Sequence, residues 1–184
     1  MIIMFLADGF EEGEAIVPLD ILRRAGADVK TVGVGRQRDS KSPVRGSHGI
    51  DVTPDLCEDE IPDGMTEMVI LPGGKVGSDN LYASAVVRDT LLAVNESGGS
   101  LAAICAAPYI LGEYGYLEGK RAVCYPGFES RLKGAVISDA QVVTDGNVIT
   151  AEGMGAAHEF GLALVAKLYG KERADKIASE IRYR

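Results

Sequence analysis

Residues 101–111 read LAAICAAPYIL, the longest uninterrupted apolar stretch of the 184-residue chain. Leu101–Ile104 is typical of a parallel strand that is covered by helices on both faces. Cys105 follows directly, and the pattern becomes helical from Ala106. A buried strand that turns at once into a helix is the building unit of doubly wound α/β sheets. The stretch is far shorter than the ~20 residues that cross a bilayer.

The same alternation of strand and helix runs through the chain. Short apolar runs predict further strands at Ile2–Leu6, Val29–Val34 and Met68–Leu71. The pair Asp145-Gly146 predicts a hairpin between strands at 140–144 and 147–151. Amphipathic patterns predict helices at 12–25 (with Ile16, Leu19 and Leu22 on its apolar face), 84–97, 156–169 and 171–181.

These elements predict a flavodoxin-like three-layer α/β/α sandwich with a mostly parallel central sheet. No repeat or linker interrupts the pattern, so residues 1–184 are expected to form one domain. In such folds the active site lies beyond the carboxyl ends of the strands. The loops at 8–14, 72–80 and 105–108 should therefore converge.

Composition narrows the class of partner. The chain has 46% hydrophobic and 25% charged residues, as soluble globular proteins do. Its 19 Lys+Arg and 27 Asp+Glu give a net charge of −8, which disfavours nucleic acid and anionic membranes. Small molecules and proteins are the expected partners. Residues 1–7 lack the basic start of a signal peptide, so a cytoplasmic, reducing location is expected.

The three cysteines are expected to stay reduced. Cys57, Cys105 and Cys124 form no C-x-x-C, and His48 and His158 are too few to complete a zinc site. Cys57 lies in an acidic stretch that should raise the pKa of its thiol and make it unreactive. Packing is the simpler explanation for Cys124. Cys105 is the remaining candidate for chemistry.

The position of Cys105 fits a nucleophile elbow. The strand–turn–helix context needs small residues two before and two after the nucleophile, and these are Ala103 and Ala107. A following helix should lower the pKa of the thiol, and the amides of Gly74 and Ala106 could form an oxyanion hole. The alternative is that Cys105 is a small buried hydrophobe.

The first loop favours the chemical interpretation. Glu11, Glu12 and Glu14 crowd the start of a helix that should face the same crevice. For each one alone, an ordinary solvated carboxylate at a helix start is the competing interpretation. A glutamate in contact with the thiol would share one proton with it and could act as a general acid–base. The loop has no phosphate-binding glycine motif, and Lys75 in the later PGG loop is weak evidence for an anion site.

Several segments together resemble one family, the ThiJ/PfpI superfamily, and within it the subfamily of the parkinsonism-associated protein deglycase and its bacterial relatives. The resemblance covers residues 1 to about 170. It is carried by ADGFEEGEAIVPLDILRRAGADV, MVILPGG, AAICAAPYIL, the pair Tyr125-Pro126 and AEGMGAAHEFGLALV.

The resemblance implies roles for matching positions. Cys105 would be the oxidisable nucleophile and Glu14 the carboxyl that hydrogen-bonds it. Glu11 would line the pocket, and the amides of Gly74 and Ala106 would form the oxyanion hole. Members are usually homodimers, and Arg24 matches an interface arginine.

Two departures concern histidine. Tyr125 stands where many members have a catalytic histidine, which disfavours a Cys–His protease. His158 falls in register with Leu162 and Val165, which favours a core or interface role. His48 lies in a polar turn and is expected to be exposed, with a contribution across a dimer interface as the alternative.

The resemblance therefore implies a glutathione-independent glyoxalase or deglycase acting on methylglyoxal or glyoxal, or on their early adducts. Cys105 would form a hemithioacetal and Glu14 would move the proton, without metal or other cofactor. Two alternatives remain open. One is a redox sensor or holdase chaperone that signals through oxidation of Cys105, and the other is a cysteine peptidase or amidase.

Overall fold

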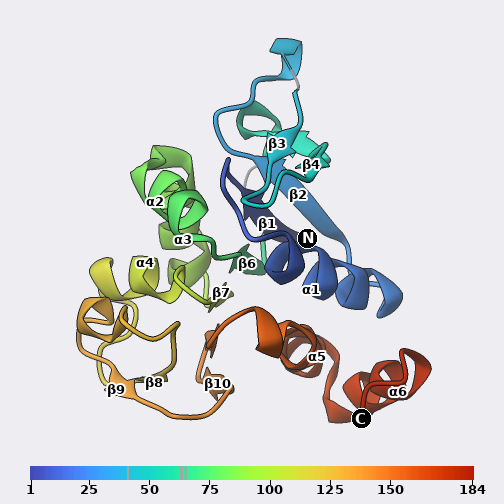
Figure 1. The fold of residues 1–184 in the computed structure, drawn as a ribbon, viewed down its shortest axis with the longest axis vertical. Coiled ribbons are helices and arrows are strands. Elements are labelled where there is room, and N and C mark those ends of the chain that lie inside the picture. The colour runs from blue at the N-terminus through green and yellow to red at the C-terminus, as the bar shows by residue number, and fades with distance from the viewer. Residues whose placement is uncertain (41, 63, 65) are drawn as a thin grey trace.

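The fold is built on a mostly parallel sheet of seven strands in the order β10-β11-β7-β6-β1-β2-β5 (Figure 1). The computed structural model describes residues 1–40, 42–62, 64 and 66–184. All neighbouring strands of this sheet are parallel except β10 and β11, which form an antiparallel hairpin. The strands are β1 Ile2–Leu6, β2 Val29–Gly33, β5 Leu56–Cys57, β6 Met68–Leu71, β7 Ser100–Ile104, β10 Val142–Asp145 and β11 Val148–Ala151.

Helices cover both faces of the sheet (Figure 1). Side chains along β1 alternate: Ile2, Met4 and Leu6 pack against α1, α5 and α6, whereas Ile3 and Phe5 pack against α2, α3 and α4. The layers follow from strands that are apolar on both sides. The helices are α1 Glu12–Arg24, α2 Lys75–Ala83, α3 Ala85–Glu96, α4 Pro108–Glu113, α5 Ala157–Tyr169 and α6 Lys171–Glu180.

Short elements complete the structure. β3 pairs with β4 in an antiparallel hairpin, and β8 pairs with β9 in parallel. Within the described residues, no helix has both the length and the apolarity needed to span a membrane. The short elements are β3 Val44–Arg45, β4 Asp51–Val52, β8 Arg121–Ala122, β9 Val136–Ile137 and the 3₁₀ turns η1 Arg38–Ser40, η2 Glu58–Glu60, η3 Glu129–Arg131 and η4 Met154–Ala156.

The predicted three-layer α/β sandwich is confirmed, with strands β1 and β6 at the predicted residues. The hairpin at Gly146 forms with φ of 60°, a backbone conformation that glycine tolerates. Two details differ. Helix α2 begins at Lys75, inside the segment expected to be a loop, because its glycines obscure the helical pattern. Ile16, expected on the apolar face of α1, is 39% exposed.

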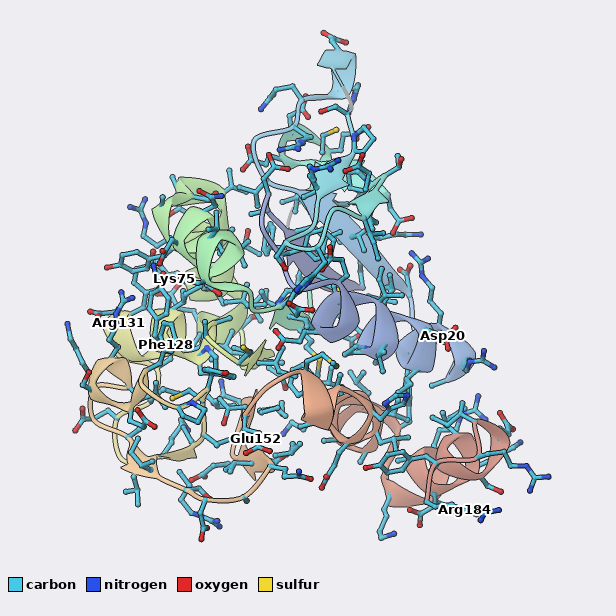
Figure 2. The ribbon with its side chains drawn as sticks, viewed as in Figure 1. Asp20, Lys75, Phe128, Arg131, Glu152 and Arg184 are labelled. Atoms are coloured by element: carbon cyan, nitrogen blue, oxygen red, sulfur yellow. The ribbon has the colours of Figure 1, made fainter. Side chains whose placement is uncertain are left out.

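Helices α2 and α4 are tied together through Tyr109. Its hydroxyl donates to Asp79 Oδ1 at 2.9 Å and to the carbonyl of Ser78 at 3.1 Å. The Arg131 guanidinium lies 3.4 Å from the centre of the Tyr109 ring, and Phe128 stacks on the same ring. Arg131 and Phe128 are labelled in Figure 2. These contacts fix the helix that follows Cys105 against the helix that follows the PGG loop.

Candidate active site

The three loops predicted to converge do meet at the carboxyl edge of the sheet. The backbone N–H of Glu11 donates to the carbonyl of Gly73 at 3.0 Å. The N–H of Gly73 in turn donates to Oε2 of Glu14 at 3.0 Å. Glu14 is 1% exposed and shares a side-chain hydrogen bond with Cys105. One carboxyl group therefore connects the loops after β1, β6 and β7.

Cys105 occupies a strained turn between β7 and α4. Its φ is 66°, and among the described residues only Arg182 is another non-glycine residue with positive φ. The turn is held by the Cys105 N–H, which donates to Ala151 O at 2.9 Å, and by Tyr125 N–H, which donates to Cys105 O at 2.8 Å. Such strain costs of order 1–3 kcal/mol and is concentrated at functional sites. The thiol is partly exposed, whereas Cys57 and Cys124 are buried.

Gly73 is a site residue that the sequence reasoning missed. A Cβ atom there would lie 2.6 Å from Cys105 Cβ and 2.8 Å from the carbonyl of Ile104, and it would also meet the Glu14 carboxylate. Glycine is therefore required by the close approach of two loops. The signal in the sequence is the Gly73-Gly74 pair just after a buried strand, of which only Gly74 is assigned a role from the sequence.

Burial and mutual charge govern the titration of Glu14 and Cys105. Burial raises the pKa of Glu14 to about 7, and the negative charge of Glu11 adds to this effect. Burial, followed by the charge of Glu14, raises the pKa of Cys105 to about 12, while amide hydrogen bonds from Gly74 and Ala106 oppose the rise. Two negative charges in contact are disfavoured, so the pair retains one proton between about pH 7 and pH 12.

The expectation that the following helix lowers the thiol pKa is wrong. Helix α4 begins only at Pro108 and ends at Glu113, so its dipole is small and starts three residues beyond Cys105. Burial and the neighbouring Glu14 outweigh the two amides, and the pKa of Cys105 rises. The amides of Gly74 and Ala106 do face the sulfur, as the elbow geometry predicts.

The other two glutamates of the first loop have different surroundings. Glu12 is buried, and its Oε1 accepts hydrogen bonds from the N–H groups of His48 at 2.7 Å and Ile50 at 3.3 Å. Burial alone would raise the pKa of Glu12, but these and other hydrogen bonds lower it to about 2. Glu11 is 21% exposed and accepts from Ser47 Oγ at 3.2 Å. The solvated interpretation therefore fails for Glu12 and Glu14.

Glu11, Glu12 and His48 place donor atoms within 4.8 Å of one another. These donors could in principle bind a divalent cation. However, the carboxylates already accept hydrogen bonds from the 46–50 turn. They also lie at the N-terminal end of α1, where the helix dipole disfavours a cation. Their arrangement is that of a hydrogen-bonded cluster.

Neither histidine contacts the thiol through a described hydrogen bond. His48 is 70% exposed, as expected, with its Nδ1 3.0 Å from Glu12 Oε2. His158 is exposed and stacks on Tyr183, so the core alternative for it is wrong and the interface alternative stays a prediction. The buried face of α5 instead carries Phe160, Gly161, Leu164 and Val165.

The remaining predicted residues lie at the surface. The Tyr125 side chain is 52% exposed, although its backbone N–H contacts Cys105. Arg24 is exposed and donates to Asp20 at 2.6 Å. Arg24 also lines a shallow hollow with His158 and Ile16. Lys75 pairs with Asp79 at 2.9 Å, so its charge is already partnered.

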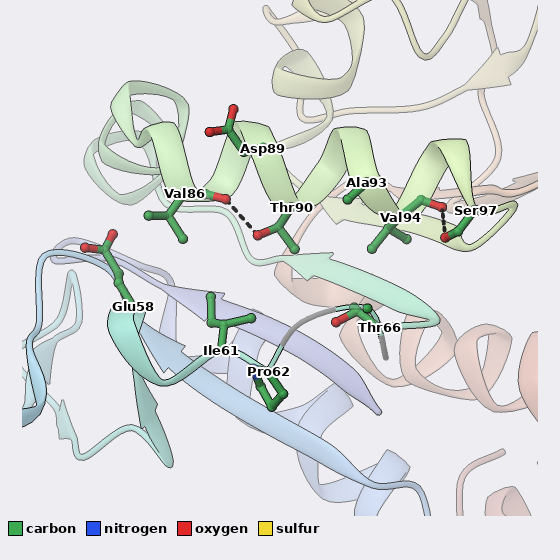
Figure 3. Close-up of a pocket in the computed structure, with 11 residues that line it drawn as sticks. Glu58, Ile61, Pro62, Thr66, Val86, Asp89, Thr90, Ala93, Val94 and Ser97 are labelled. Carbon is green, nitrogen blue, oxygen red and sulfur yellow. Dashed lines mark hydrogen bonds between the residues drawn. The ribbon is translucent and has the colours of Figure 1, made fainter.

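A separate cavity of about 370 Å³ lies between α3 and the segment after η2 (Figure 3). Ile61 and Pro62 face Val86 and Val94 across it. Thr90 and Ser97 donate to carbonyls of their own helix, at 2.7 and 2.9 Å. Its lining includes neither Cys105 nor Glu14, so the candidate chemistry lies elsewhere.

Comparison with known proteins identifies the family. The model of the DJ-1/PfpI family matches residues 1–167. The chain belongs to the DJ-1/PfpI family. Protein dj-1beta of Drosophila melanogaster is 36% identical over 178 residues, covering 96% of this chain and 93% of the relative. The glutathione-independent glyoxalase DJR-1.2 of Caenorhabditis elegans is 31% identical over 178 residues, covering 96% and 92%.

Solved structures agree with this membership. A DJ-1 superfamily protein from Salmonella typhimurium, solved as its C103A mutant, superposes with a TM-score of 0.92 at 36% identity. The match covers 100% of this chain and 98% of that one. Oxidized DJ-1 of Toxoplasma gondii gives a TM-score of 0.92 at 33% identity, covering 99% and 97%. This chain thus has the fold of a family that includes a named glyoxalase.

Proposed function

We propose that this family member is a glutathione-independent glyoxalase or deglycase that acts on methylglyoxal or glyoxal, or on their early adducts with amines and thiols. The observation that carries the proposal is the hydrogen bond between the thiol of Cys105 and the buried carboxyl of Glu14, a pair whose raised pKa values leave it with one proton above about pH 7. With the proton on Glu14, the sulfur is a thiolate nucleophile and the carboxyl is a general acid.

The first step forms a carbon–sulfur bond. The Cys105 thiolate attacks the aldehyde carbon of methylglyoxal, and the carbonyl electron pair moves onto oxygen. The amides of Gly74 and Ala106, which face the sulfur, would stabilise that oxyanion. Glu14 then donates its proton to the oxygen, which gives a neutral hemithioacetal and leaves Glu14 as a carboxylate.

The second step isomerises the hemithioacetal. The Glu14 carboxylate removes the proton from the carbon bonded to sulfur, and the electrons move onto the adjacent ketone to form an enediolate. Return of a proton to the second carbon, with loss of the hydroxyl proton from the first, gives a thioester of lactate. Attack by water breaks the carbon–sulfur bond, releases lactate and a proton, and restores the pair. Glyoxal gives glycolate by the same steps.

The direct test is conversion of methylglyoxal to lactate by the purified chain without glutathione. The Cys105→Ala variant should lose lactate formation, whereas Cys57→Ala should retain it because Cys57 is buried on β5 at the far side of β2. Unchanged lactate formation by the Cys105→Ala variant would disprove the proposed function.

A second candidate function is redox sensing through oxidation of Cys105. It is supported by burial, because Cys105 is partly exposed whereas Cys57 and Cys124 are buried. A protonated Glu14 could also donate a hydrogen bond to an oxidised sulfur. Mild peroxide should oxidise Cys105 before the other two cysteines, and mass spectrometry of the cysteine-containing peptides would show the order. Earlier modification of Cys57 or Cys124 would disprove it.

Peptidase activity has the least support. A cysteine peptidase needs a general base in contact with the thiol, and the recorded side-chain hydrogen bond of Cys105 goes to Glu14. His48 contacts Glu12, and His158 stacks on Tyr183. A preparation that produces lactate should therefore show no cleavage of peptide substrates.

A homodimer is also part of the proposal. Ile16 is an exposed apolar residue on α1, beside a hollow lined by Arg24, His158 and Ile181. Exposed apolar surface of this kind is typical of subunit interfaces. Sedimentation equilibrium should give twice the chain mass, and the Ile16→Glu variant should shift it toward the monomer. A monomeric parent chain would contradict this part.

A further inference from the structure

Glu12 is a buried carboxylate that the proposed reaction does not use. Its Oε1 accepts hydrogen bonds from the N–H groups of His48 and Ile50, and its Oε2 lies 3.0 Å from His48 Nδ1. A Cβ atom at Gly46 would collide with this carboxylate. Glu12 therefore fixes the 46–50 turn tightly against the start of α1.

The 46–50 turn also holds Glu11 in place. The Ser47 N–H donates to the carbonyl of Phe10 at 2.9 Å, and the Ser47 hydroxyl donates to Glu11 Oε2 at 3.2 Å. His48 Nδ1 lies 3.4 Å from the same oxygen. Glu11 is only 21% exposed, so its carboxylate has restricted freedom to move into solvent.

Glu11 and Glu14 are connected through a single glycine. The carbonyl of Gly73 accepts from the Glu11 N–H, and the N–H of Gly73 donates to the Glu14 carboxyl, each at 3.0 Å. A fixed negative charge beside a buried carboxyl favours the protonated form of that carboxyl. The charge of Glu11 does act on Glu14 in this direction.

We propose that Glu11 is a fixed anion that keeps the shared proton on Glu14 rather than on Cys105, and that Glu12 and Ser47 are positioning residues that hold Glu11 in place. The inference deepens the proposed function, since it rests on the thiolate of Cys105 being the reactive form. It assigns to the first loop the control of the pH range in which the sulfur is nucleophilic.

Other charges near the turn have defined effects. His48 has a raised pKa because of its hydrogen bond to Glu12, and its protonated form weakens the influence of Glu11. Arg45 pairs with Asp51 at 3.1 Å, and Asp8 pairs with Arg36 at 2.7 Å. These two ion pairs are internally neutralised, and Glu11 is the neighbouring charge that acts on the Glu14 carboxyl.

The test is the pH dependence of Cys105 alkylation by iodoacetamide, followed by mass spectrometry of the Cys105 peptide. In Glu11→Gln, loss of the anion should lower the pH midpoint by roughly 0.5–1 unit. The substitution should also reduce the plateau rate of alkylation several-fold, because a larger fraction of the molecules then carries the shared proton on sulfur. Ser47→Ala and Glu12→Gln should shift the midpoint in the same direction by a smaller amount.

Matched controls are Glu172→Gln on α6 and Ser97→Ala at the C-terminal cap of α3, which should leave the midpoint unchanged. An unchanged or higher midpoint in Glu11→Gln would overturn the inference. A shift in Glu11→Gln without one in either Ser47→Ala or Glu12→Gln would overturn the positioning role. Alkylation of Cys105 does not require catalytic turnover. A parent chain that makes no lactate would therefore disprove the proposed function, while the pH midpoints of alkylation would still test the role of Glu11.

Discussion

The buried carboxyl of Glu14 and the partly exposed thiol of Cys105 share a hydrogen bond at the carboxyl edge of the sheet. Burial raises the pKa of Glu14 to about 7 and that of Cys105 to about 12. Because the two groups are coupled, these values belong to the pair, which carries one proton and one negative charge between them. The proposed function places that proton on Glu14. In the proposed reaction this one proton would serve both nucleophilic attack by Cys105 and acid–base transfer by Glu14, without histidine.

Removing the carboxyl proton donor should separate binding from chemistry. In Glu14→Gln the amide can still accept a hydrogen bond from Gly73, but it cannot transfer a proton. We expect kcat for lactate formation to fall by about 10²- to 10⁴-fold, with a much smaller change in KM. Steady-state kinetics measures both. A Glu14→Gln variant with unchanged kcat would exclude Glu14 as the acid–base group.

The same substitution should stabilise the fold at alkaline pH. The folded pair of Glu14 and Cys105 loses its first proton at a pKa of about 7, whereas the unfolded chain loses the Glu14 proton near 4.5, so the native chain binds more protons between these values. Stability should therefore fall by of order 2–3 kcal/mol as the pH rises from about 4.5 to 7. Glu14→Gln should lose this dependence in urea unfolding at pH 5 and pH 8. Parallel curves for the two proteins would contradict the raised pKa.

Glu12 should have the opposite effect on stability. Its pKa is lowered to about 2, so its contribution is present above the ordinary value of 4.5 and is lost as the pH falls toward 2. Glu12→Gln should cost about 1–3 kcal/mol at pH 7, because hydrogen bonds to a buried carboxylate are weakened. The cost should shrink in acid. The exposed Glu172→Gln is the control, and an equal loss in both variants would argue against a special role for Glu12.

Gly73 should tolerate no side chain. A Cβ atom would approach Cys105 Cβ to 2.6 Å, so Gly73→Ala must displace the loop that binds Glu14. We expect loss of lactate formation and a lowered Tm. Gly155→Ala is a matched control, because a Cβ there meets nothing within 4 Å. Normal activity in Gly73→Ala would show that the close approach of the two loops is not needed.

The sequence was sufficient to predict the layers and the convergence of three loops. Strands such as Ile2–Leu6 are apolar on both faces, and parallel strands bring their following loops to one edge. The resemblance added the roles expected for Cys105 and Glu14. The layers and the convergence of the loops follow from local hydrophobic pattern, which can be read directly from the sequence.

The features that could not be predicted from the sequence depend on tertiary contacts. The bond between Glu12 and His48 joins residues 36 positions apart, and no local pattern predicts it. Gly73 was overlooked because a close approach between loops depends on their packing. His158 is exposed and outside the core, because helical spacing alone does not decide which of two adjacent stripes of a helix faces the sheet. The direction of the Cys105 pKa depended on burial, which is also a property of the packed fold.

The most direct test of the account is the ultraviolet absorbance of the Cys105 thiolate, measured as a pH titration against Cys105→Ser. If Glu14 holds the shared proton, thiolate absorbance should appear with a midpoint at or below about pH 7, where the pair loses its first proton. The absorbance should then stay constant through pH 9. A thiolate signal that appears only near pH 12 would place the proton on sulfur and contradict the account.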